Sequence, residues 1–528
     1  MQEWIDAIKN LYTEWKGAEP LLVDVLPISG SERRYFRLHA CLPDRQEKEG
    51  TIIGTYGANV KENEAFIYFS EHFYKKSLAV PQIYAVSKDR MYYLQQDFGN
   101  TSLLNCLEAD GFTQPVYDLF KKSLAALASL QVNGDKGLDY KKCLTNKEFG
   151  KEAIMADLLY FKYYFLDALR KPYDKQKLIK DFEALSNYLT HTEYKYFMFR
   201  DFQSRNIFIT DVVSGDTNQG NGDTNHGSGD NNHGKAVHFI DYQGGMKGAP
   251  QYDVASMLWQ ARANLPEEWK KNLLEGYMNV FELLIDGSLD RIVFRSQYNG
   301  YVLIRLLQVL GAYGFRGLFE RKAQFLTAIP LGLRNLKEFF QHQSIGISVP
   351  EFRKVLDICV ADEIIQQFSP TQATDKTKLV VKINSFSYRK GIPQDETNNG
   401  GGFVFDCRGI LNPGRIEEFK TQHGRDKAVK DYLEQQTNML NYLNSVFDLV
   451  DTSVEEYIKR DFESLMVSFG CTGGQHRSVY AADALARHLR NKFKVKIELK
   501  HLIQEEKNWL NTPQAPKGEQ EASPSKSG

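Results

Sequence analysis

The chain has 528 residues, 42% of them hydrophobic, and its 66 Lys and Arg against 67 Asp and Glu give a formal net charge of −1. At roughly 150 residues per domain this length predicts two to four globular units, and the balanced charge argues against a nucleic-acid binder whose whole surface is basic. No apolar run reaches the roughly 20 residues that a membrane-spanning helix needs. The six cysteines form no CxxC pair, as is typical of the reducing cytoplasm. We therefore expect a multidomain cytoplasmic protein without a membrane segment.

The first 365 residues begin with strand-like patterns and end with helical ones. At the N-terminus, the apolar residues of WIDAIKNLYTEW fall on one face of a helix. In residues 21–100, the short β-branched and aromatic runs RRYFRL, TIIGTYG and MYYLQQDF are typical of strands. Helical spacing dominates after Leu103. We expect a β-rich lobe over about 1–98 and a helical lobe over about 99–365.

Three polar segments divide the rest of the chain. Residues 213–235 hold a repeat, GDTNQGN, GDTNHGS and GDNNHG, whose Gly, Asn and Asp residues favour turns and cannot build a core. Residues 366–378 form a candidate linker, and the Pro- and Gly-rich residues 511–528 form a tail. We expect the repeat and the tail to be disordered. Between linker and tail, residues 379–510 show β and α patterns that predict a smaller α/β domain.

A group of polar residues follows the strand-like run YKYFMF. Asp201 and Asn206 lie five residues apart, and Asp241 follows a later apolar run, VHFI. In phosphoryl transfer, one carboxylate accepts the proton of the acceptor hydroxyl, while an Asn oxygen and a second carboxylate hold Mg²⁺ on the ATP phosphates. Oxygen ligands of this kind suit Mg²⁺. The pattern predicts Asp201 as the catalytic base and Asn206 and Asp241 as magnesium ligands.

Three ordered motifs resemble the aminoglycoside phosphotransferase family of protein-kinase-like enzymes. They are the loop FRDFQSRN, the segment DYQ and the segment YDVASML. Together with SGSERRYFRL, the loop is most similar to the bacterial kinases that phosphorylate cell-wall amino sugars at the anomeric position. The resemblance implies a bilobal protein-kinase-like fold, ATP and Mg²⁺ as cofactors, and a small-molecule sugar as the acceptor.

The resemblance also implies a nucleotide site in the β-rich lobe. SGSERRYFRL stands where the family places the hairpin that covers the nucleotide, so Ser29, Gly30 and Ser31 would offer N–H groups to phosphates. A plain hairpin turn is the alternative. LQQDFG resembles the hinge between the lobes and places Gln96 near the adenine. Asp157 is either a substrate contact or an exposed helix carboxylate.

Two departures from the family pattern affect this prediction. Phe199 stands where the family has His, and the strand of residues 51–57 lacks the Lys that grips the α- and β-phosphates. We assign a nucleotide contact to Arg34, with Arg33 and Lys61 as alternative replacements for that Lys. A domain that binds nucleotide but turns it over poorly is the other interpretation.

A second functional pattern joins a strand, a Gly-rich loop and a helix. The apolar run SLMVSFG leads into CTGGQHRS (471–478), and helical spacing follows. Backbone N–H groups of such a loop and of the helix N-terminus converge on one point, which favours anion binding, and Arg477 could add a bidentate contact. The C-x5-R spacing also fits a cysteine phosphatase with an activated thiol. Gly470 stands where those enzymes usually carry His, so we favour a small buried residue at position 471.

The segments GCTGGQHRSVY, SFSY, FDCR and NP resemble the C-terminal domain of RapZ, over about residues 379–505. This resemblance implies a phosphosugar-sensing domain that oligomerises and binds small RNAs. The implied contacts to a phosphorylated amino sugar are Cys471, Thr472, Gly473, Gly474, Gln475, His476, Arg477, Ser478, Asp406 and Arg408. A basic stretch in residues 487–500 could neutralise RNA phosphates. Such a stretch is more often a solvated face, so RNA is not the favoured partner.

The two resemblances predict an ATP- and Mg²⁺-dependent sugar or amino-sugar kinase fused to a phosphosugar-sensing domain. The alternative is a regulatory protein that binds nucleotide and phosphosugar, with a weakly active or inactive kinase domain. Homo-oligomerisation through the C-terminal domain is a further expectation of the RapZ resemblance.

Overall fold

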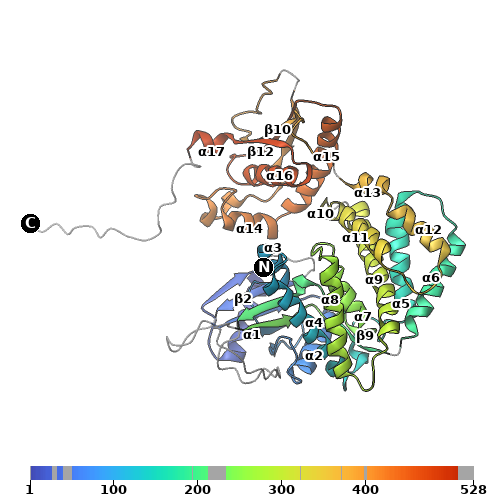
Figure 1. Ribbon diagram of the computed structural model, residues 1–528. Coiled ribbons are helices and arrows are strands. Elements are labelled where there is room, and N and C mark those ends of the chain that lie inside the picture. Colours follow the sequence, from blue (N-terminus) through green and yellow to red (C-terminus); the bar gives the residue numbers. More distant parts are fainter. Residues whose placement is uncertain are drawn as a thin grey trace, which may run out of the picture. The chain divides into compact units, whose positions relative to one another are not determined.

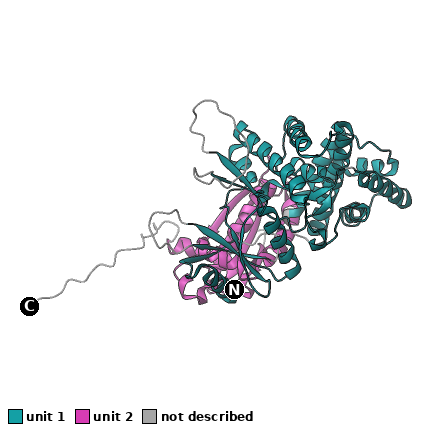
Figure 2. Ribbon diagram, turned by 90° about the horizontal axis from the view of Figure 1, so that it is seen from below, with its two compact units in different colours: residues 1–369 teal, residues 370–528 magenta. Residues whose placement is uncertain are grey.

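The computed structural model describes residues 2–26, 33–39, 50–192, 194–211, 234–320, 323–369, 371–397 and 401–508 (Figure 1). The predicted phosphate contacts Ser29, Gly30 and Ser31 lie outside the described residues, as do residues 212–233 and the tail. The chain divides into two compact units, residues 1–369 and residues 370–528 (Figure 2). Each unit has a hydrophobic core of its own, so the two are described separately.

The first unit opens with a five-stranded antiparallel sheet of order β1-β2-β3-β5-β4 (Figure 1). Its strands are β1 (Leu22–Val25), β2 (Arg34–His39), β3 (Thr51–Tyr56), β4 (Ile83–Val86) and β5 (Tyr92–Gln96). Helix α1 (Gln2–Lys16) packs Ile8 and Tyr12 against Phe36 and Leu94 of the sheet. A Cβ at Gly54 of β3 would lie 2.6 Å from Cγ2 of Ile8, so this close packing requires glycine. Helix α2 (Val60–Tyr74) follows β3 directly.

A helical lobe completes the first unit. Its helices are α3 (Leu103–Asp110), α4 (Gln114–Asp135), α5 (Lys151–Phe161), α6 (Lys175–Thr190), α7 (Gln251–Leu258), α8 (Glu267–Leu284), α9 (Arg291–Tyr313), α10 (Ala323–Leu326), α11 (Ile329–His342), α12 (Pro350–Cys359) and α13 (Asp362–Phe368). Helix α13 thus extends into the segment predicted as a linker. Some of these helices start at a side-chain cap, as in α3, where Ser102 and Asn105 form a capping box, and in α9, where Asp290 caps two N–H groups.

Two short antiparallel ribbons lie within the helical lobe and carry the functional loops. One pairs β6 (Tyr196–Met198) with β9 (Met246–Gly248), and the other pairs β7 (Ile207–Asp211) with β8 (Lys235–Phe239). The stretch Arg291–Phe319, which contains α9, is long and apolar enough to cross a membrane, but 56% of its apolar window is buried inside the structure. Core helices of globular proteins have the same character.

The second unit is a parallel sheet of order β11-β12-β10-β13 with helices (Figure 1). Its elements are β10 (Val380–Ser387), β11 (Gly402–Asp406), α14 (Lys427–Gln435), α15 (Met439–Lys459), β12 (Ser464–Cys471), α16 (Arg477–Phe493), β13 (Lys496–His501) and α17 (Leu502–Glu506). Parallel register sets Ser387 beside Cys471 and Asp406 beside Gly470. The carboxyl ends of three strands therefore meet at one edge. The predicted fold class, a β-rich lobe, a helical lobe and a smaller α/β domain, is confirmed.

Candidate functional site

The structure brings the three predicted residues of phosphoryl transfer together. Nδ2 of Asn206 donates one hydrogen bond to the backbone oxygen of Asp201, at 3.0 Å, and another to Oδ2 of Asp241, at 3.2 Å. Asp201 follows β6, and Asp241 follows β8. Arg200 and Asp241 both adopt positive φ angles, 81° and 71°. Such angles are uncommon for residues other than glycine and often accompany functional sites.

The environment of Asp241 suits a metal ion. Burial and the negative charge of Asp201 raise the pKa of Asp241, which means that they disfavour its ionised form. A bound cation would stabilise the ionised carboxylate. Carboxylate and amide oxygens are ligands that Mg²⁺ accepts in proteins. Within the described ranges, no group of three or more His, Cys, Asp or Glu side chains could hold a metal. An ion held by Asn206 and Asp241 would therefore need further oxygen ligands, such as phosphates and water.

Asp201 is held by positive charge. Its Oδ1 lies 2.7 Å from Nη2 of Arg305 and accepts a hydrogen bond of 2.6 Å from Gln203, while Oδ2 lies 3.3 Å from Arg205. Burial acts to raise the pKa of Asp201, but the two guanidinium groups outweigh it and keep that pKa below its usual value. The carboxylate is thus ionised and oriented. Arg305 is 104 residues from Asp201 in the chain, and no sequence motif indicated it.

Helix α7 fixes the loop that carries Asp201. Asp253 in α7 accepts hydrogen bonds from the N–H groups of Phe199 and Arg200, at 2.8 and 2.9 Å, and from the side chain of Gln131. Burial raises the pKa of Asp253 to about 6. Gln260, just beyond α7, accepts hydrogen bonds from the N–H and the hydroxyl of Ser204. The YDVASML motif was matched in the sequence, but the structural role of its Asp was not predicted.

The structure places Asp157 in a buried ion pair. Both carboxylate oxygens of Asp157 accept hydrogen bonds of 3.0 Å from the guanidinium of Arg200. That guanidinium also lies 4.5 Å from the ring centre of Phe149. Asp157 is only 7% exposed, so it is not the exposed helix carboxylate that was one of its two interpretations. In this structure its contacts orient the loop residue next to Asp201.

Residues of β2 point alternately to its two faces, and this separates Arg33 from Arg34. The Arg34 guanidinium lies 5.8 Å from the ring centre of Trp4 in α1, on the face where Phe36 also packs. Arg33 lies on the other face, with Nη2 3.3 Å from Oε1 of Glu62 in α2. The structure therefore brings Arg33, and not Arg34, toward Asp241.

Glu62 and Gln243 connect Arg33 to the Asp241 cluster. Nε2 of Gln243 donates to Oε1 of Glu62, at 3.2 Å, and to Oδ1 of Asp241, at 2.9 Å. Oε1 of the predicted hinge residue Gln96 accepts a hydrogen bond from the N–H of Gln82. Sequence reasoning gave no role to Glu62 or Gln243. The one sequence signal for Glu62 was its position, a carboxylate in the first turn of the helix after β3.

The Gly-rich loop of the second unit lies between β12 and α16. Sγ of Cys471 lies 3.2 Å from the N–H nitrogen of Gly474 and 3.2 Å from Oγ of Ser478. Gly474 has a φ of 66°, and a Cβ there would lie 2.5 Å from Cγ1 of Ile503, so the turn requires glycine. The Cys471 thiol is buried. Thr472 and Gly473 are the exposed residues of the loop.

Several predicted phosphosugar contacts hold backbone carbonyls instead of facing solvent. Gln475 donates to the carbonyls of residues 420 and 422, and a ring nitrogen of His476 lies 2.8 Å from the carbonyl of residue 419. Arg477 donates through Nη1 to the carbonyls of residues 408 and 410, and its buried Nε has no partner among the described residues. Asp406 and Arg408 pair with each other at 2.7 Å. These side chains stabilise the segments around the loop.

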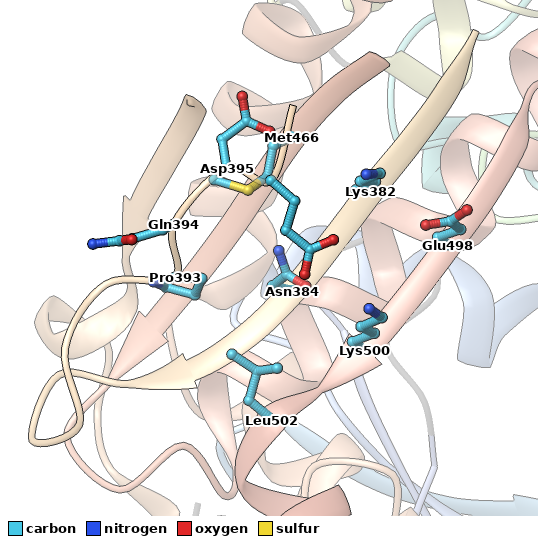
Figure 3. A pocket seen from close by; sticks show the side chains of 10 residues that line it. Lys382, Asn384, Pro393, Gln394, Asp395, Met466, Glu498, Lys500 and Leu502 are labelled. Atoms are coloured by element: carbon cyan, nitrogen blue, oxygen red, sulfur yellow. The ribbon is translucent and has the colours of Figure 1, made fainter. Parts of the chain in front are cut away.

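A separate cavity of about 260 Å³ lies on the same sheet, and no residue of the loop lines it. Figure 3 shows Lys382 of β10, with Glu498 and Lys500 of β13, on its floor and Asp395 on the segment above it. Both positively charged lysines and negatively charged carboxylates therefore line this cavity. No sequence pattern indicates this cavity, because its residues come from strands and a loop that only the sheet order β11-β12-β10-β13 brings together.

The fold defines the class of the first unit, a bilobal kinase-like fold, and the residues predicted for phosphoryl transfer lie together in its helical lobe. In the second unit, residues 379–503 match the family described as the RapZ C-terminal domain. A nucleotide-binding protein of Endomicrobium trichonymphae is 35% identical over 189 residues, which cover 32% of this chain and 64% of that relative. The chain thus spans less than two thirds of that relative's length.

Solved structures of small-molecule kinases are similar to the chain in fold. A choline/ethanolamine kinase family protein from Mesorhizobium loti has 13% identity and a TM-score of 0.41, covering 67% of this chain and 98% of that one. The ADP-bound aminoglycoside phosphotransferase APH(2'')-Ib has 11% identity and a TM-score of 0.37, covering 64% of this chain and 97% of that one.

Proposed function

We propose that the first unit is an ATP- and Mg²⁺-dependent phosphotransferase that acts on a hydroxyl of a small molecule. The observation that carries this proposal is the position of Asn206, which is hydrogen-bonded to Asp201 at 3.0 Å and to Asp241 at 3.2 Å. Asn206 and Asp241 would hold Mg²⁺, and a bound Mg²⁺ ion neutralises phosphate charge in such reactions.

Asp201 has the properties of the base in this reaction. Its carboxylate is ionised, because Arg305 and Arg205 lower its pKa, and Gln203 and Arg305 fix its orientation. Asp201 accepts a hydrogen bond from the acceptor hydroxyl and takes its proton as phosphorus–oxygen bond formation proceeds. Asp253 keeps the loop in place through two backbone N–H groups.

We propose a sugar or amino sugar of cell-wall metabolism as the acceptor. This part of the proposal rests on the similarity of the RDFQSRNI and SGSERRYFRL segments to cell-wall amino-sugar kinases. Fold alone does not specify a substrate, so the acceptor has to be identified with a panel of amino sugars and, for comparison, choline and ethanolamine.

The test compares wild type with Asp201→Asn in an ADP-release assay with ATP, Mg²⁺ and that panel. Loss of a general base typically costs about 100-fold or more in turnover, so we expect a loss of at least that size with ATP affinity retained. Equal turnover by the variant would disprove the role of Asp201. A wild type that binds ATP without transferring phosphate to any acceptor would favour the alternative function, a nucleotide-binding regulator.

For the second unit we infer a binding site for the phosphate of a phosphorylated amino sugar. The supporting observation is the strand–loop–helix geometry, in which the exposed Thr472 and Gly473 precede a helix of 17 residues. N–H groups at such a helix N-terminus favour an anion. The match of residues 379–503 to the RapZ C-terminal domain supports the same inference.

Gly473 allows a sharp test of this second function. A Cβ at this position would meet no atom within 4 Å, so Gly473→Asp adds a negative charge to the loop without a steric clash. We expect Gly473→Asp to weaken binding of glucosamine 6-phosphate about tenfold or more by calorimetry, while the neutral control Gly473→Asn binds nearly as wild type does. Equal binding by the Asp variant would contradict an anion site at this loop.

A further inference from the structure

The nucleotide-binding lobe lacks a cation where kinases of this architecture use one. In protein kinases a Lys of the third strand contacts the phosphates and pairs with a Glu of the following helix. No Lys or Arg occurs in residues 51–60, which include β3. The helix after β3 nevertheless has its carboxylate, Glu62, in the first turn of α2. The partner of that carboxylate identifies the residue that replaces the lysine.

Arg33 is the partner of Glu62. It directly precedes β2, and the pairing of Arg34 with Tyr56 sets this end of β2 beside the end of β3. Nη2 of Arg33 lies 3.3 Å from Oε1 of Glu62, and the guanidinium lies 5.7 Å from the ring centre of Phe66 in the same helix. Arg33 therefore reaches the start of α2 from the strand next to β3.

The Arg33 guanidinium is buried and incompletely satisfied. Arg33 is 5% exposed; its Nη2 contacts Glu62 only as an ion pair at 3.3 Å, and its Nε has no hydrogen-bond acceptor among the residues that the structure describes. Buried donors without acceptors are unfavourable, and a buried charge is more so. A guanidinium that keeps a buried N–H without an acceptor, besides its contact with Glu62, is suited to binding a phosphate oxygen.

The open guanidinium belongs to the same network as the predicted magnesium ligand. Glu62 accepts a hydrogen bond from Gln243 at 3.2 Å, and Gln243 donates to Asp241 at 2.9 Å. If a nucleotide's phosphates bind a metal ion held by Asp241, Arg33 lies near them on the side of the β-rich lobe. Gln243 thus links Glu62, which holds Arg33, to Asp241, the predicted magnesium ligand.

We propose that Arg33, held by Glu62, binds a phosphate of the nucleotide in place of the strand lysine. This inference rests on the proposed function of the first unit and adds a residue to its nucleotide site. The ligand class is a nucleoside di- or triphosphate, because the interaction is with phosphate oxygens and not with the base or ribose. Glu62 is a positioning residue that acts through Arg33.

The test measures binding of ATP, ADP and adenosine to the full chain by calorimetry. We expect Arg33→Gln to weaken ATP and ADP binding about tenfold or more while leaving adenosine unchanged. Arg33→Lys keeps the positive charge but loses the paired N–H donors of the guanidinium. We therefore expect a smaller loss of affinity, again confined to the phosphorylated ligands. Glu62→Gln should show the same ligand pattern. The control Lys88→Gln, which removes an exposed charge of the same lobe, should bind all three ligands as wild type does.

Three results would overturn the inference. One is an Arg33→Gln protein that binds ATP as wild type does, and another is an equal loss for adenosine and ATP. The third is a loss in Arg34→Gln that Arg33→Gln does not share. If Arg33→Gln does not fold, Arg33→Lys and Glu62→Gln give the same comparison. A wild type that binds no nucleotide would overturn the proposed function together with this inference, which distinguishes that failure from the others.

Discussion

The two carboxylates at the centre of the first unit have opposite electrostatic environments. Arg305 and Arg205 keep the pKa of Asp201 below its usual value, whereas burial and the charge of Asp201 raise the pKa of Asp241. Neighbouring carboxylates whose pKa values are pushed apart commonly have different chemical roles. The lowered pKa of Asp201 favours an ionised carboxylate for contact with the acceptor hydroxyl, and Asp241, whose pKa is raised, gains most from a bound cation. The guanidinium groups around Asp201 therefore help to divide the two roles.

Asp253 provides a prediction at the residue scale. Phe199 and Arg200 donate to different oxygens of Asp253, and Asp253→Asn replaces one of these oxygens with an NH₂ group, so one of the two backbone donors loses its acceptor. We expect the free energy of unfolding to fall by about 1–3 kcal/mol and kcat to fall because the loop carrying Asp201 is less well positioned. Chemical denaturation and steady-state kinetics measure the two effects.

The control for Asp253→Asn is Asp110→Asn, which changes an exposed carboxylate at the end of α3. We expect this control to alter neither quantity measurably. The Kd for ATP should stay near its wild-type value in both proteins, because Asp253 contacts the loop and not the β-rich lobe, where we propose that the nucleotide binds. An Asp253→Asn protein with unchanged stability and unchanged kcat would show that the two backbone contacts do not hold the loop.

At the scale of elements, sequence patterns located strands, helices and motif loops but not their neighbours. The motif pattern was sufficient to predict that Asp201, Asn206 and Asp241 lie together, and each lies at the end of a short strand: Asp201 after β6, Asn206 directly before β7 and Asp241 after β8. The choice between Arg33 and Arg34 was not predictable, because consecutive strand residues face opposite sides and the sequence does not show which side faces Glu62 and Asp241. The position of α1 against the Phe36 face decides it.

Long-range pairing explains the other residues that the sequence did not reveal. Arg305 reaches Asp201 from α9, and the sheet order β11-β12-β10-β13 assembles the charged cavity of the second unit. In the Gly-rich loop, the motif predicted an anion site, but it did not show that Gln475 and His476 hold neighbouring carbonyls. Short-range motifs identify loops, while tertiary packing determines which side chains of a loop are available to a ligand.

At the scale of the whole molecule, the two units have separate hydrophobic cores. The buried core residues of the first unit lie between Ile8 and Ile365, and those of the second lie between Leu379 and Val495. Each unit is large enough to fold on its own. Because a core unfolds cooperatively, two cores that share no residues can unfold in separate transitions.

We predict two thermal unfolding transitions for the full chain, each sensitive to a different ligand. A ligand that binds only the folded state stabilises it by about 2.7 kcal/mol at 100 times its Kd. ATP with Mg²⁺ should therefore raise only the transition of the first unit, and glucosamine 6-phosphate only that of the second. Differential scanning calorimetry measures both, and residues 371–508 expressed alone should reproduce the second transition. A single transition that either ligand shifts would mean that the units unfold together, and the two binding functions would then be thermodynamically linked.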